Sequence, residues 1–109
     1  MNGPSRREKI EAMLEKDPQD QFLRYQLAME LEKIEAHAES LALFQGLMCD
    51  VPPHVPSFLM AAQHLTKRDR IDEARGILRS GIEAARSQGN AHAAGEMSEL
   101  LASLGSQNS

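Results

Sequence analysis

The chain has 109 residues, of which 41% are hydrophobic and 26% are charged, so it is long enough for one folded domain and too short for two of ordinary size. Its formal net charge of −4 argues against a protein that binds nucleic acid or an anionic membrane surface. A single cysteine, the lack of an apolar run at the N-terminus and the lack of a membrane-spanning window together predict a cytoplasmic protein.

The predicted elements are all helices. Ala, Leu, Glu, Lys, Arg, Gln and Met dominate the sequence, and aromatic residues are only 4%, so strands have little to build with. Apolar residues recur at helical spacing within segments that turn-forming residues separate. In chain order, these segments predict helices over 5–16, 20–34, 36–49, 56–67, 70–87 and 91–104.

Several of these helices carry end signals. Pro18 stops the first helix, because proline has no backbone N–H and disfavours helix at the residue before it. Asp69 precedes the fifth helix and is predicted to cap its N-terminus. Pro56 falls in the first turn of the fourth helix, where its missing donor does no harm. Residues 105–109 are predicted to fray.

A repeat organises the helices. Pro18 and Pro52 are 34 residues apart, and a shift of 34 residues lays apolar or small residues on residues of the same kind. The pairs matched in this way are Leu27 with Ala61, Ala28 with Ala62, Leu31 with Leu65, Ser40 with Ala74, and Phe44 with Leu78. A helix–turn–helix unit of this period predicts a short α-solenoid of antiparallel helix pairs.

On these residues, the chain resembles the tetratricopeptide repeat (TPR) family, and more loosely its small stand-alone bacterial members. Residues 21–54 and 55–88 correspond to two full units. Residues 5–16 resemble the second helix of a preceding unit, and residues 90–104 resemble a C-terminal capping helix. The resemblance implies an all-α, right-handed superhelix in a single domain over 1–109.

The sequence departs from the family pattern at several positions. Glu35 and Asp69 stand in the turns between paired helices, where the family often has glycine. Arg24 replaces the large apolar residue expected early in the first unit. The second unit ends at Arg86 and Ser87 without a proline. These departures weaken the motif but leave the 34-residue period unchanged.

No constellation of residues predicts catalysis or a cofactor. Cys49, His37, His54 and His64 all lie more than four residues apart, whereas zinc ligands usually come in close pairs. Cys49 is predicted to be a buried or half-buried apolar filler at the end of the third helix. No glycine-rich phosphate loop is present, and no nucleophile, base and stabiliser can be assembled. We therefore expect no enzyme, no metal, no cofactor and no small-molecule substrate.

The family's usual role is to hold a peptide or helix of a partner in a groove lined by the first helices of its units. The implied groove positions are Phe22, Tyr25, Gln26, Met29, Glu32 and Lys33 in the first unit, and Leu59, Met60, Gln63, Thr66 and Lys67 in the second. Tyr25, Met29 and Met60 stand where chaperone-binding members carry the residues that clamp a terminal carboxylate. We therefore do not expect that clamp here.

Two functions remain open on the sequence alone. The chain is either an adaptor that binds a protein or peptide partner in the groove, or a structural module that forms a homodimer through the same apolar patch or through an exposed end face. Met29 and Met60 favour an adaptable contact surface, because methionine is flexible and polarisable. The same residues are also compatible with a helix core, or with a groove that an end helix covers.

Overall fold

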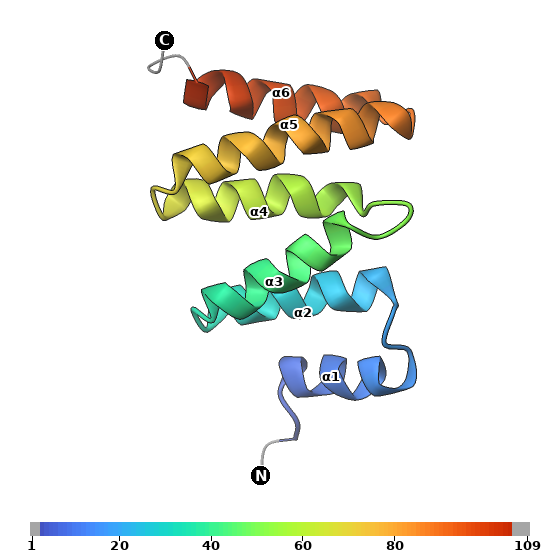
Figure 1. The fold of residues 1–109 in the computed structure, drawn as a ribbon. Coiled ribbons are helices and arrows are strands. Elements are labelled where there is room, and N and C mark those ends of the chain that lie inside the picture. The colour runs from blue at the N-terminus through green and yellow to red at the C-terminus, as the bar shows by residue number, and fades with distance from the viewer. Residues whose placement is uncertain (1–2, 106–109) are drawn as a thin grey trace. The chain divides into compact units, whose positions relative to one another are not determined.

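The computed structural model describes residues 3–105, which form six α-helices and no strand (Figure 1). The helices are α1 (Arg6–Lys16), α2 (Gln21–Lys33), α3 (His37–Met48), α4 (Val55–Lys67), α5 (Ile71–Ser87) and α6 (Ala91–Gly105). Every end lies within one residue of the end predicted from the sequence, so the all-α prediction is confirmed. The predicted fraying of the tail falls outside the described residues from position 106 onward.

The chain divides into two compact units, Met1–Pro52 with α1 to α3 and Pro53–Ser109 with α4 to α6. In the first unit, α2 packs against both α1 and α3. In the second unit, α5 packs against both α4 and α6. The boundary follows the cis peptide bond between Val51 and Pro52. One domain over 1–109 stays a prediction.

The core of the first unit depends on small residues where α2 meets α3. Ala28 and Ser40 are fully buried, and the Ser40 hydroxyl donates a hydrogen bond of 2.9 Å to the Ala28 carbonyl. Phe44 and Leu47 of α3 are buried beside this contact. Small side chains let the two helix backbones approach closely, as the repeat predicts.

The second unit repeats this arrangement with α4 and α5. Ala62 and Ala74, the counterparts of Ala28 and Ser40, have no exposed surface. Phe58 and Leu78 are buried around them. Because α6 adds a third layer against α5, this unit also buries Met97 completely.

Three helices end in the same left-handed turn. Glu35, Asp69 and Gly89 follow α2, α4 and α5 with φ of 61°, 61° and 72°. In each turn the next residue donates its N–H to a carbonyl five residues back, over 2.9, 2.9 and 2.8 Å, which is the Schellman pattern. The prediction that Asp69 caps α5 is therefore wrong, because its backbone closes α4. The N-cap of α5 is Arg70, whose side chain makes no capping hydrogen bond.

Candidate functional site

The candidate site on the first unit is the side of α2 that faces neither α1 nor α3. Ala28 marks the side toward α3, through the Ser40 hydrogen bond. Glu30 marks the side toward α1, because Arg6 Nε lies 3.1 Å from its carboxylate. Successive residues of a helix are rotated by about 100°, so Met29 points between the directions of Ala28 and Glu30. Lys33 lies one helical turn after Met29 and points in a similar direction. Met29 is half-buried and Lys33 is exposed.

Tyr25 stands at the edge of this face and is anchored in the core. Its ring meets Phe44 edge to face, with 5.9 Å between centroids and 65° between planes. The residue is half-buried, and burial raises the pKa of its phenol above the ordinary value of 10.0. A ring fixed on one side and accessible on the other is suited to contact a partner without losing much entropy.

The polar groove residues of α2 already have partners within the chain. Arg6 Nη2 donates a 2.7 Å hydrogen bond to Gln26 Oε1, and Lys33 Nζ lies 2.9 Å from Glu30. Glu32 lies 3.1 Å from His37 Nδ1. The hydrogen bond from Lys33, with the charges of Lys33 and Arg6, lowers the pKa of Glu30. Gln26 and Glu30 therefore both connect α2 to Arg6 of α1. Lys33 helps to neutralise the carboxylate of Glu30.

The second unit presents an equivalent face on α4. Leu59 and Met60 are half-buried, and Gln63 and Lys67 are exposed. The opposite side of α4 carries its buried residues, Phe58, Ala61, Ala62 and Leu65 among them. Thr66 Oγ1 donates a 2.8 Å hydrogen bond to the Ala62 carbonyl and is therefore engaged by its own helix. Of the eleven predicted groove positions, six lie on α2 and five on α4.

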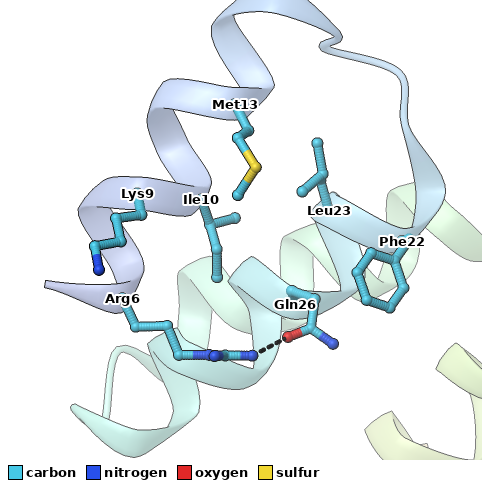
Figure 2. Close-up of a pocket in the computed structure, with 7 residues that line it drawn as sticks. All are labelled: Arg6, Lys9, Ile10, Met13, Phe22, Leu23 and Gln26. Carbon is cyan, nitrogen blue, oxygen red and sulfur yellow. Dashed lines mark hydrogen bonds between the residues drawn. The ribbon is translucent and has the colours of Figure 1, made fainter.

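A pocket of about 170 Å³ lies between α1 and α2 of the first unit (Figure 2). Its lining consists of Arg6, Lys9, Ile10 and Met13 from α1, with Phe22, Leu23 and Gln26 from α2. Two predicted groove residues, Phe22 and Gln26, therefore line this hollow beside α1. Sequence reasoning missed the pocket, because the helical spacing of Ile10 and Met13 indicates an apolar face but not whether a neighbour fills it.

Two arginines have structural roles that the sequence did not reveal. Arg24 makes a bidentate contact of 2.5 and 3.2 Å with Asp50, just beyond the end of α3. Gln21 also donates to Asp50, over 3.0 Å. Arg75 is only 6% exposed and donates a 2.5 Å hydrogen bond to the Leu104 carbonyl near the end of α6. Arg24 thus replaces the expected apolar contact of the first unit with an ionic one.

The residues considered for chemistry are not gathered into a metal site among residues 3–105. Cys49 is exposed, so the prediction of a buried or half-buried filler is wrong; its backbone N–H closes the end of α3. Within residues 3–105, no three His, Cys, Asp or Glu side chains are grouped so that they could hold a metal ion. His54 Nδ1 lies 2.8 Å from the Ser57 hydroxyl at the start of α4. Over the same residues, no helix is long and apolar enough to span a membrane.

Comparison with known proteins identifies the family through a solved structure. No family model and no curated protein matches the sequence. Among solved structures, the chain is similar to a tetratricopeptide repeat domain protein from Salinibacter ruber determined by NMR. The two share 31% identity with a TM-score of 0.74, over 81% of this chain and 89% of that one. The fold predicted from the 34-residue repeat is confirmed, and the chain belongs to the tetratricopeptide repeat family.

Proposed function

We propose that this protein is a non-catalytic adaptor that binds a peptide or helix of a partner protein along the open faces of α2 and α4. Tetratricopeptide repeat domains generally mediate interactions between proteins. The observation that carries the proposal is that Tyr25, Met29, Leu59 and Met60 are large, only half-buried, and placed on those faces.

The chemistry of these side chains suits recognition of an apolar segment. Tyr25 supplies a rigid ring that Phe44 holds in place, and aromatic anchors of this kind often dominate binding energy. Met29 and Met60 supply flexible, polarisable surface that adapts to partners of different shape. Lys33 and Lys67 supply a polar rim. We place the interaction in the cytoplasm, where the exposed thiol of Cys49 stays reduced.

Affinity capture from cells of the source organism tests the proposal. The wild type is compared with a Tyr25→Ala/Met29→Ala variant and a Leu59→Ala/Met60→Ala variant. An Arg79→Ala/Ser80→Ala variant, altered at two exposed positions of α5, is the matched control. We expect a partner that the wild type and the control retain and that at least one face variant loses. A partner that binds all four proteins equally would contradict the proposal.

Self-association is the competing outcome. Sedimentation of the purified protein at micromolar concentration tests this alternative, because a monomer would exclude the homodimer. A dimer that the Tyr25→Ala/Met29→Ala variant dissociates would instead assign the α2 face to contact with a second copy of the chain.

A further inference from the structure

The pocket between α1 and α2 gathers exposed apolar surface in one place. Phe22 is 66% exposed and Met13 is 48% exposed, and both line it. Figure 2 shows Ile10 and Met13 of α1 on one side and Leu23 of α2 on the other, with the Arg6–Gln26 hydrogen bond joining the helices at one end. Apolar surface concentrated at a hollow, rather than scattered singly, indicates a contact site.

The size of the pocket favours a single side chain over a small molecule. Its volume of about 170 Å³ is below the range of about 300–1,000 Å³ that is typical of pockets for drug-sized ligands. The lining is apolar except for Arg6, Lys9 and Gln26. One large aliphatic or aromatic side chain from another protein fits such a hollow in the way that interface anchors fill theirs.

The charges beside the pocket favour a partner that carries a carboxylate. Both charged residues in the lining, Arg6 and Lys9, are cations. Arg6 is engaged by Gln26 and Glu30. Lys9 is exposed, and its ammonium group has no ion pair or hydrogen bond within residues 3–105.

No carboxylate within residues 3–105 is paired with Lys9, and three acidic residues of α1 and α2 have contacts elsewhere. Glu8 belongs to the capping box with Ser5. Glu11 lies 3.4 Å from Arg7. Glu30 binds Arg6 and Lys33. The edge of the pocket therefore carries one cation that a partner can neutralise.

We propose that this pocket receives one large apolar side chain of a partner peptide, and that a carboxylate beside that side chain pairs with Lys9. The inference deepens and rests on the proposed function, because Phe22 and Gln26 are predicted groove positions of α2 and also line the pocket. The carboxylate is that of an internal acidic residue, so the peptide needs no free C-terminus.

Four blocked octapeptides test the proposal by NMR titration of the labelled, full-length protein. Three have a Leu-Phe centre flanked on both sides by Glu, by Gln or by Lys, and the fourth has an Ala-Ala centre flanked by Glu. We expect the Glu-flanked Leu-Phe peptide to shift Met13, Phe22 and Leu23 saturably. It should bind about three- to fivefold more tightly than the Gln-flanked peptide, the effect of one exposed ion pair. The Ala-Ala peptide should give no saturable shift.

Two variants assign the charge and the anchor separately. Lys9→Glu should reverse the order of the peptide affinities, so that the Lys-flanked Leu-Phe peptide binds most tightly. Phe22→Ala should abolish saturable shifts of Met13 and Leu23 with all four peptides. Lys16→Glu makes the same charge change at an exposed position of α1 outside the pocket, and the original order should persist. All three sites are exposed, so the fold is expected to survive each change.

Other outcomes would overturn the inference while leaving the proposed function to its own test. Saturable shifts at Tyr25 and Met29 without shifts at Met13 and Leu23 would place binding on the α2 face and outside the pocket. An unchanged order of affinities in Lys9→Glu would remove the role of Lys9. No saturable shift with any peptide would also overturn the inference, whereas the adaptor function is decided by capture with the variants of α2 and α4.

Discussion

Gly81 packs so closely against Phe58 that position 81 has no room for a side chain. A Cβ atom on Gly81 would lie 2.6 Å from Phe58 Cβ and 2.5 Å from Met97 Sδ. A shift of 34 residues pairs Gly81 with Leu47 and Phe58 with Arg24. The second unit thus combines a large early residue with a glycine, whereas the first combines an arginine that pairs with Asp50 and a fully buried leucine.

Gly81→Ala should therefore destabilise the protein although alanine is the better helix former. Methionine sulfur can move aside, but Phe58 Cβ lies next to the backbone of α4 and cannot, so overpacking should cost about 1–3 kcal/mol. Gly76→Ala on the same helix is the control, because nothing lies within 4 Å of its Cβ position. That variant should gain about 0.5–1 kcal/mol. Urea denaturation measures both, and a stabilised Gly81→Ala would disprove the packing argument.

The left-handed turns at Glu35 and Asp69 predict a gain from glycine. A non-glycine residue at φ of 61° is strained by its Cβ, and glycine relieves this strain at some cost in unfolded-state entropy. Each of Glu35→Gly and Asp69→Gly should raise the free energy of unfolding by about 0.5–1 kcal/mol. Their effects should add, because the two turns belong to different units. Gly89→Ala at the third such turn is the converse control and should lower stability.

How much of this fold the sequence predicts depends on whether the signal is local. Helix ends follow from apolar periodicity and from breakers such as Pro18, which act over a few residues, so they were predicted to within one residue. Asp69 shows where local signals compete. An aspartate shortly before an acidic first turn is typical of an N-cap, but the Schellman turn that ends α4 uses the same residue.

The site is less predictable, because its features depend on contacts between segments that are far apart in the sequence. The positions of Tyr25, Met29, Leu59 and Met60 on their helices follow from the repeat register. The pocket does not, since it depends on how far α1 stands from α2. The burial of Arg75 depends equally on the course of α6, because its partner is 29 residues away.

Glu30 should make stability depend on pH in the acid range. The hydrogen bond from Lys33 and the charges of Lys33 and Arg6 hold its folded pKa below the ordinary value of 4.5. Its contribution is therefore complete above about pH 4.5 and is lost as the pH falls through the lowered value. Glu30→Gln should be less stable than the wild type at pH 7, and the difference should shrink toward pH 3.

Urea midpoints between pH 3 and 7 measure this effect. Glu99→Gln, at an exposed position of α6, is the control for the loss of one carboxylate. If the difference in stability between Glu30→Gln and the wild type grew on acidification, the pKa of Glu30 would not be lowered in the folded protein. That result would refute the stabilising contacts assigned to Glu30.

Arg75 should contribute to stability through α6 rather than through its ion pair. Its side chain is 7% exposed and lies 2.6 Å from Asp72, which is 95% exposed, so water screens that pair strongly. The hydrogen bond to the Leu104 carbonyl is buried and satisfies an acceptor near the negative end of α6. Arg75→Ala should cost about 1–3 kcal/mol by leaving that carbonyl without this donor, whereas Asp72→Ala should cost under about 1 kcal/mol.

Hydrogen exchange locates the effect of Arg75. In Arg75→Ala, amides in the last turns of α6 should lose protection more than those of α4, because the lost contact lies at the end of α6. Arg79→Ala, one turn later on α5 and exposed, should change stability by less than about 0.5 kcal/mol and leave the pattern unaltered. Equal losses in Arg75→Ala and Asp72→Ala would instead assign the stabilisation to the ion pair.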